Sequence, residues 1–187
     1  MKIGLFFGSF NPIHIGHVAI AKYMAEKTDL YRVWMVVSPR NPLKEKKYLA
    51  DAKKRLVQVK KAIGKNPKIK VSDVEFKLPQ PSYTIYTLRF LTEKFPRHEF
   101  VIIMGSDNLA LFHKWKSYKK ILENYQIYVY PRSSPLKRGA GPKDSLERGF
   151  FKNHRNIKMA DAPKIDISST FIREQMRKGR DVKDFVM

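Results

Sequence analysis

The chain of 187 residues contains no cysteine. This absence excludes disulfide bonds and zinc sites with thiolate ligands, and it fits a reducing compartment. Long apolar runs are also missing, because none approaches the roughly 20 residues that a membrane-spanning helix needs. The N-terminus lacks a signal-peptide pattern, since Lys2 is followed by a short apolar run and then by a glycine turn. The sequence therefore predicts a cytoplasmic protein without a membrane partner.

Acidic residues are scarce: 17 of them face 38 basic residues, which leaves a formal net charge of +21. Such an excess favours polyanionic partners, namely nucleic acid, an anionic membrane or phosphorylated small molecules. The basic residues are spread along the chain and are most frequent at residues 40–70, which include Arg55, and at residues 114–120 and 173–183. This spread is typical of a solvated basic surface. No zinc finger, aromatic RNA-binding signature or helix-turn-helix is recognisable, so no specific nucleic-acid partner is expected.

Apolar stretches that predict strands alternate with segments of helical period. The strands are expected at residues 2–7, 32–37, 69–74, 99–104, 126–130 and 156–159. The helices are expected at residues 16–27, 50–63, 82–95, 118–122 and 168–177. Residues 132–155 are expected to form an exposed, mobile connection. The length suits one domain over residues 1–187, with the C-terminal helical segment 168–187 as part of it.

Continuous apolar strands that alternate with helices indicate a mostly parallel sheet with helices on both faces. The predicted fold class is therefore α/β, a Rossmann-like doubly wound sheet. Ligands bind such sheets in the crevice at the carboxyl ends of the strands. The loops after the first, second and fourth strands, residues 8–17, 38–47 and 105–115, should line one site.

The segment from Gly8 to His17 joins the first predicted strand to the first predicted helix. A glycine turn at a helix N-terminus presents backbone N–H groups that can hold phosphate. His14 and His17 lie three residues apart, so a metal pair, and plain capping or packing, are alternatives. No carboxylate or third histidine accompanies them, whereas zinc prefers three or four protein ligands. Phosphate contact through imidazole N–H groups is the favoured interpretation.

A second candidate lies near the C-terminus, where Ser168, Ser169 and Thr170 precede Arg173. Serine at a helix start can simply cap the helix. The same first turn offers N–H groups and hydroxyls to an anion, and arginine adds a fork of donors suited to phosphate. Considered alone, this segment leaves capping and phosphate binding equally open.

Together the two segments resemble the HxGH nucleotidyltransferases and, among these, the bacterial nicotinate-nucleotide adenylyltransferases. Two further segments match in family order: Pro81-Ser82-Tyr83-Thr84-Ile85, and Gly105-Ser106-Asp107-Asn108-Leu109 followed by Phe112-His113-Lys114-Trp115. The matches extend over nearly the whole chain. The first motif specifies the superfamily, while the Tyr-Thr and Phe-His-Lys-Trp segments favour the nicotinate branch.

The resemblance implies a role for each matching residue. The catalytic residues, which contact the ATP phosphates, would be His14, His17 and Arg173. Further ATP contacts would come from Gly8, Ser9, Phe10, Lys44, Gly105, Asp107, Ser168 and Ser169. The mononucleotide would contact Asn11, Tyr83, Thr84 and Trp115. Its carboxylate would meet N–H groups at a helix start and its ring would stack on the tryptophan, for which a core position is the alternative.

The implied reaction transfers AMP from ATP to nicotinate mononucleotide, giving deamido-NAD and pyrophosphate in NAD biosynthesis. Mg²⁺ would bridge the ATP phosphates with few or no protein ligands. Nicotinamide mononucleotide or pantetheine phosphate is the alternative acceptor, and a non-catalytic polyanion or nucleic-acid binder is the alternative class. A homo-oligomer is left open.

Two departures from the family pattern stand out. Tyr86 occupies a position where the family usually has an aspartate, so the hydrogen bond that the acid would make, near the substrate or within the first turn of the helix, is not expected here. The family also continues beyond the Ser-Ser-Thr helix with a further segment, whereas this chain ends at Met187.

Overall fold

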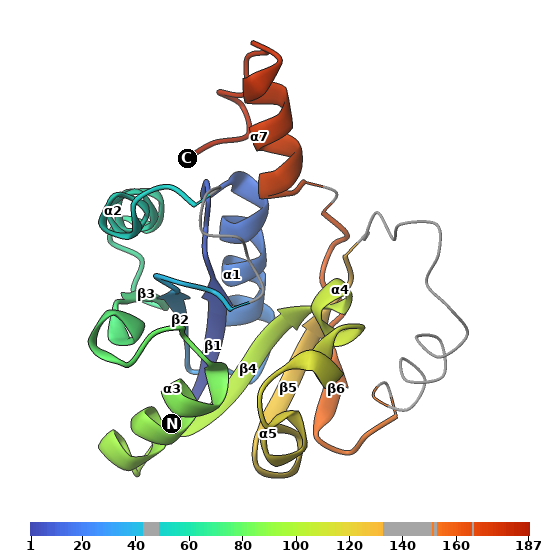
Figure 1. Cartoon of the computed structure of the whole chain (residues 1–187). Helices are drawn as coiled ribbons and strands as arrows, with labels where there is room; N and C mark the ends of the chain where they lie inside the picture. The colour runs from blue at the N-terminus through green and yellow to red at the C-terminus, as the bar shows by residue number, and fades with distance from the viewer. Residues whose placement is uncertain (43–48, 133–150, 152, 166) are drawn as a thin grey trace.

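The computed structural model describes residues 1–42, 49–132, 151, 153–165 and 167–187. Six strands form one sheet in the order β3-β2-β1-β4-β5-β6, and every pair of neighbours is parallel (Figure 1). This order is that of a doubly wound Rossmann-like sheet, so the predicted fold class is confirmed. The strands are β1 (Lys2–Gly8), β2 (Arg32–Val37), β3 (Ile69–Ser72), β4 (Glu99–Gly105), β5 (Gln126–Tyr130) and β6 (Ile157–Met159).

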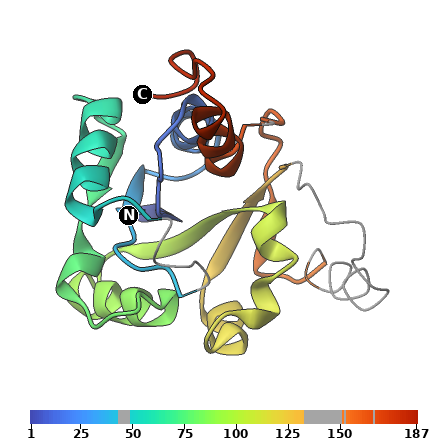
Figure 2. The same ribbon diagram turned by 45° about the horizontal axis from the view of Figure 1, so that its top comes forward.

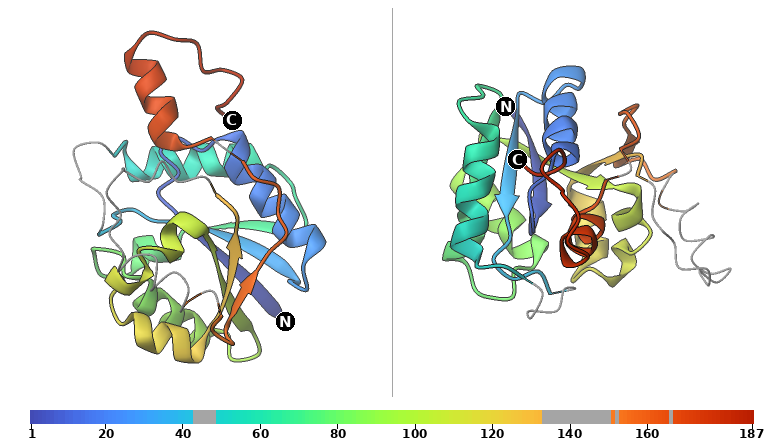
Figure 3. Two further views of the ribbon diagram at one scale, coloured as in Figure 1. Left: turned by 90° about the vertical axis from the view of Figure 1, so that its right-hand side faces the viewer. Right: turned by 90° about the horizontal axis from the view of Figure 1, so that it is seen from above.

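Helices cover both faces of the sheet, because successive strand residues point to opposite sides. On one face α1 (Ile15–Lys27) and α2 (Ala52–Ile63) pack on side chains such as Phe6 and Met35. On the other face α3 (Thr84–Lys94) and α5 (Tyr118–Asn124) pack on side chains such as Leu5 and Ile102. The left panel of Figure 3 shows the sheet between these two pairs of helices.

Most differences from the predicted elements concern their ends. β3 stops at Ser72 and is followed by a short 3₁₀ helix, η2 (Val74–Lys77), where the sequence predicted continued strand. α2 begins two residues late because the Asp51 side chain accepts a hydrogen bond from the Lys54 N–H at 2.9 Å and caps it. Besides η2, two further short helices were not predicted, α4 (Ser106–Leu109) and η3 (Phe112–Lys114).

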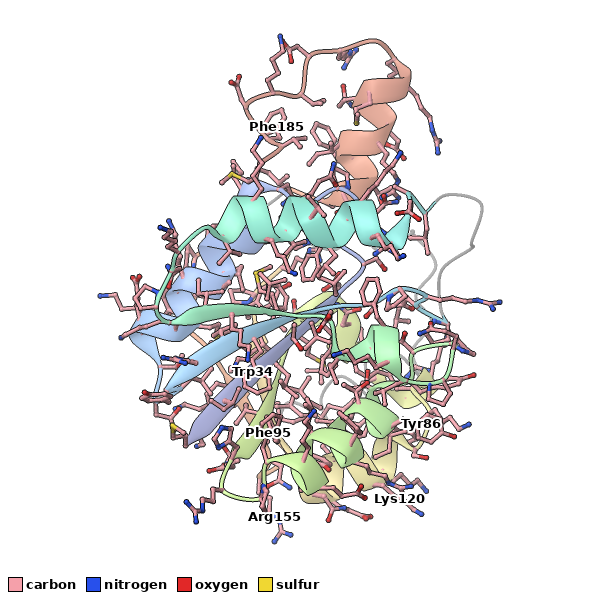
Figure 4. All side chains as sticks on the ribbon, turned by 90° about the vertical axis from the view of Figure 1, so that its left-hand side faces the viewer. Trp34, Tyr86, Phe95, Lys120, Arg155 and Phe185 are labelled. Atoms are coloured by element: carbon pink, nitrogen blue, oxygen red, sulfur yellow. The ribbon has the colours of Figure 1, made fainter. Side chains whose placement is uncertain are left out.

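The C-terminal helix α7 (Ser169–Arg177) stands away from the sheet, next to α1 (Figure 1 and Figure 2). Beyond it the chain returns to the start of α1, where the Ile15 N–H donates to the Phe185 carbonyl at 3.0 Å. The ring of Phe185, in this returning segment, packs against α7 and meets the ring of Phe171 edge-on at 6.2 Å (Figure 4). These contacts support the proposal that residues 168–187 belong to the same domain as the sheet.

No helix in the described part of the chain combines the length and hydropathy that a membrane crossing requires. The connection predicted at residues 132–155 falls mostly outside the described residues. Lys44 and the rest of residues 43–47, half of the predicted loop after β2, also lie outside them.

Candidate active site

A pocket of about 780 Å³ opens at the carboxyl ends of β1 and β4. These are the central strands at which the order of a doubly wound sheet reverses, and ligands bind at such a switch point. The volume is in the range of small-molecule sites. The predicted site residues that line it are Gly8, Ser9, Phe10, Asn11, His17, Tyr83, Thr84, Asp107, Trp115, Ser168, Ser169 and Arg173.

His17 lies in the first turn of α1 and lines this pocket. Its Nδ1 accepts a hydrogen bond from the His14 backbone N–H at 3.3 Å. Since Nδ1 acts as acceptor, the proton of the neutral ring is assigned to Nε2. The Phe10 ring meets the imidazole edge-on at 5.0 Å and supports its orientation. The arrangement prepares Nε2–H of His17 as a hydrogen-bond donor.

His14 lies beneath the pocket rather than in its lining, with only 2% of its surface exposed. Its ring contacts that of His17, with 3.6 Å between centroids and the planes tilted by 32°. Burial, with the Arg132 charge as second cause, lowers the pKa of His14 to about 4. The ring is therefore neutral at pH 7. Within the described residues, no group of three histidine, aspartate or glutamate side chains is placed to hold a metal.

The loop after β1 is shaped by the ring of Phe10. This residue has a left-handed backbone, with φ of 44°, which is uncommon for a residue with a side chain, and it is 2% exposed. The ring lies over Gly8, where an added Cβ would come within 2.7 Å of it. Glycine at position 8 therefore leaves room for the ring of Phe10. Phe10 supports the loop after β1 and also lines the pocket.

Arg55 is a site residue that the sequence analysis assigned to the basic surface, and this assignment was wrong: the side chain is 1% exposed. From α2 its guanidinium donates to the carbonyls of Ser9 and Ser38, and at 2.8 Å to that of Pro39. It thus connects the loops after β1 and β2 from below. No sequence signal separates Arg55 from the neighbouring lysines, because burial depends on how α2 packs.

Glu75 is a second buried ionisable residue that sequence reasoning missed, and it lies in η2 with 1% exposure. The Thr87 hydroxyl donates to its Oε1 at 2.9 Å. Burial raises the pKa of Glu75, while hydrogen bonds from Ser38, Thr87 and Ser82 oppose the rise. The Ser38 carbonyl accepts a hydrogen bond from Arg55, so Arg55 and Glu75 are linked through this one residue.

The start of α7 both caps the helix and faces the pocket. The Ser168 hydroxyl accepts from the Phe171 N–H at 3.1 Å, which confirms the predicted cap. Ser169 Oγ donates to the Pro12 carbonyl at 3.0 Å, and Arg173 Nη1 donates to the Asn11 carbonyl at 2.7 Å. Capping and phosphate binding, the two interpretations left open by the sequence, are therefore compatible, because the residues that cap α7 also line the pocket.

At the end of β4 the carboxylate of Asp107 lies 3.5 Å from the Arg132 guanidinium, and both line the pocket. Gly105 is outside the lining, but an added Cβ there would collide with the Asp107 carboxylate. Tyr130 lies alongside, and burial raises the pKa of its hydroxyl to about 12. Arg132 was missed because it follows β5, whose C-terminal loop the sequence analysis did not assign to the site.

Rings and lysines make up the opposite side of the pocket. Trp115 is half-buried, edge-on to Phe112 at 5.5 Å, so it packs on the core and lines the pocket at once. Tyr83 is the N-cap residue of α3, and Thr84 begins that helix. Lys116 completes this side of the lining and was not among the predicted site residues.

The model of the cytidylyltransferase-like family matches residues 5–175 of the chain. A protein of Flavobacterium johnsoniae named "Probable nicotinate-nucleotide adenylyltransferase" is 53% identical over 183 residues, which are 98% of this chain and 90% of that protein. A protein of Cytophaga hutchinsonii with the same name is 46% identical over 186 residues, covering 100% of this chain and 91% of that protein.

Among solved structures, nicotinic acid mononucleotide adenylyltransferase of Plasmodium falciparum complexed with NaAD is similar with a TM-score of 0.77. The sequence identity is 18%, and the match covers 99% of this chain and 90% of that chain, so the likeness supports the fold. The matched residues 5–175 contain the loop after β1 and the first turns of α7. The chain belongs to the cytidylyltransferase-like family and, by its full-length relatives, to the nicotinate-nucleotide adenylyltransferases.

Proposed function

We propose that the chain transfers the adenylyl group of ATP to nicotinate mononucleotide, forming deamido-NAD and pyrophosphate in NAD biosynthesis. The observation that carries the proposal is that one pocket gathers both groups of residues expected to bind the substrates, which we call its two halves. The phosphate half comprises residues 8–11, His17, residues 168–170 and Arg173. The pyridine half comprises Tyr83, Thr84, Trp115 and Lys116. Such a division suits two substrates, one with a triphosphate and one with a pyridine ring, that react where the two halves meet.

In the phosphate half, three kinds of donor would hold the triphosphate. They are the Nε2–H of His17, the hydroxyls at the start of α7 and the guanidinium of Arg173. The contacts Arg173–Asn11 and Ser169–Pro12 hold these donors together before substrate binds. His14, neutral and buried, orients His17 in this scheme, and its own predicted phosphate contact stays a prediction.

In the reaction a phosphate oxygen of the mononucleotide attacks the α-phosphorus of ATP in line, and the bond to the pyrophosphate oxygen breaks. The nucleophile is already anionic, so no strong general base is required. Negative charge grows on the α-phosphoryl oxygens and on the leaving group. Donors positioned beforehand, with His17 and Arg173 first among them, stabilise that charge.

Adenosine would bind where β4 ends. The Asp107 carboxylate accepts hydrogen bonds from the ribose hydroxyls, and the ion pair with Arg132 orients the carboxylate. Gly105 contributes by the absence of a side chain, because only glycine leaves room for this conformation of Asp107.

The mononucleotide would bind in the pyridine half, with Asn11 at the boundary between the halves. The first N–H groups of α3, at Thr84 and the residue after it, have no intrahelical partner and can receive the nicotinate carboxylate. The indole of Trp115 offers a face for stacking on the pyridine ring. Nicotinate mononucleotide therefore matches both features at once.

ATP enters as its Mg²⁺ complex in this proposal, and the metal neutralises charge on the phosphate oxygens. The donor set fits a metal carried by the substrate, because Asp107 is the single carboxylate among the described lining residues. The predicted phosphate contact of Lys44, outside the described residues, stays a prediction, as does the oligomeric state.

The deciding experiment measures pyrophosphate release with MgATP and a panel of acceptors: nicotinate mononucleotide, nicotinamide mononucleotide and pantetheine phosphate. We expect the highest kcat/KM with nicotinate mononucleotide, and deamido-NAD as the product by mass spectrometry. A clear preference for another acceptor would replace the substrate. Salt-dependent nucleic-acid binding without pyrophosphate release would replace the enzyme by a polyanion binder.

A further inference from the structure

An ammonium group is held over two tyrosine rings at the rim of the pyridine half. Lys116 Nζ lies 4.6 Å from the ring centroid of Tyr83 and 4.9 Å from that of Tyr86. The two rings meet edge-on with 5.8 Å between centroids. A cation above an aromatic face is attracted by the ring quadrupole, and here two faces act on one lysine. The side chain is therefore restrained although its surroundings are open to solvent.

The two tyrosines belong to the start of α3, the place proposed for the nicotinate carboxylate. Tyr83 is the N-cap residue of α3, and Tyr86, labelled in Figure 4, lies in the first turn of that helix. Helix N-termini favour negative charge. Lys116 adds a full positive charge beside this partial one, and it follows directly on Trp115.

No carboxylate of the chain neutralises this lysine within the described residues, since none of the ion pairs found there includes Lys116. The hydrogen bond with Tyr86 raises the pKa of Lys116, which keeps the ammonium charged at neutral pH. Tyr86, the residue that departs from the family pattern, thus acts as part of the clamp on the lysine.

We propose that Lys116 is a specificity-determining residue: its ammonium, restrained by Tyr83 and Tyr86, favours the carboxylate of a nicotinate ring over the neutral carboxamide of a nicotinamide ring. The inference rests on the proposed function, because it assigns one substrate group to one end of the pocket. A carboxamide can still accept hydrogen bonds from the helix N–H groups, but it gains no ion pair from the lysine.

The test compares kcat/KM for nicotinate mononucleotide and nicotinamide mononucleotide at saturating MgATP. Lys116→Met should lower the value for the acid about 10-fold and change the value for the amide little, as expected for loss of one charge-assisted contact. Lys116→Arg should restore most of the preference because it retains the charge. Tyr86→Ala, which removes half of the clamp, should lower the acid-to-amide ratio by a smaller factor.

Lys70→Met is the matched control. Lys70 Nζ also lies over an aromatic ring, that of Trp34 at 4.8 Å, but outside this pocket. The control removes the same charge and the same type of contact, and it should leave the acid-to-amide ratio unchanged.

The outcomes separate this inference from the proposed function. A wild-type protein that prefers the acid, together with a Lys116→Met variant of unchanged ratio, would overturn the lysine assignment alone. An equal loss with acid and amide would also overturn it, because that result indicates general support of the pocket. A wild-type protein inactive with both mononucleotides would overturn the proposed function and this inference with it.

Discussion

In the phosphate half of the pocket, the loop after β1 is held by charged groups that donate to its own carbonyls: Arg55 from below and Arg173 from above. In the pyridine half, the corresponding supports are aromatic rings at the surface, with Lys116 over Tyr83 and Tyr86. The first set is buried or half-buried, whereas Tyr86 is 39% exposed. Fixed donors stabilise charge that develops during reaction, while exposed rings mainly recognise a substrate that is already bound.

This difference predicts that changes in the phosphate half alter turnover or stability, and that changes in the pyridine half alter the apparent affinity for one substrate. Replacing His17 should have the largest effect. His17→Ala removes a donor that acts on the charge of the transition state, so kcat should fall roughly 100-fold or more. Steady-state pyrophosphate release measures it.

His98→Ala, which alters a histidine packed against Phe95 outside the pocket, is the control for the histidine change. If His17→Ala raised KM for ATP and kept kcat, the imidazole would bind the ground state only. The comparison between the two halves would then lose its basis.

Arg55→Met should destabilise the fold by about 3 kcal/mol, because the carbonyls of Ser9 and Ser38 would stay buried without their donor. Urea denaturation gives the free energy of unfolding. Lys61→Met, an exposed position at the C-terminal end of the same helix, should change it by less than about 0.5 kcal/mol. Equal effects of the two variants would mean that Arg55 is not the connection between the loops.

His14 predicts a dependence of stability on pH. Its pKa is about 4 in the folded chain and 6.5 ordinarily, so the unfolded chain binds the proton first as the pH falls. The stabilisation present above pH 6.5 should be lost between pH 6.5 and 4, by about 3 kcal/mol in the wild type. His14→Asn lacks this titration, and urea denaturation across that range should show a flatter profile. Parallel profiles would contradict the buried, neutral state of His14.

Trp115→Ala should give the smallest effect, an increase of about 10-fold in KM for nicotinate mononucleotide with KM for ATP unchanged, because one stacking contact is lost. Trp115→Phe should recover part of the affinity. An unchanged KM in Trp115→Ala would assign the indole to the core alone and would leave the pyridine half without its ring contact.

The strand positions, the parallel sheet and the place of the pocket could be predicted from the sequence. Five strands coincide with their predicted ranges to within one residue, because parallel strands covered on both faces are continuous apolar runs. β3 is the exception: the prediction included Val74, which is buried in η2. An apolar residue carries the same signal in a strand and in a short 3₁₀ turn, so pattern alone could not separate them.

The site residues also include some that the sequence could predict and some that it could not. Local motifs predicted the loop after β1, the cap at Ser168 and the ring of Trp115, since each depends on neighbours in sequence. Arg55, Glu75 and Arg132 could not be predicted, because their partners lie far away along the chain: Arg55 and Ser9, for example, are 46 residues apart. A lysine-rich helix gives no indication of which of its cations will be buried.

By itself, then, the sequence determined the order of elements, the doubly wound sheet and the residue types gathered at its carboxyl edge. The physical reason is that the period of apolar residues and the chemistry of helix starts are local properties. Only the tertiary structure decided that His14 lies below the pocket and His17 in its lining, and that Lys116 lies over Tyr83 and Tyr86. Those placements depend on packing between segments that no local pattern connects.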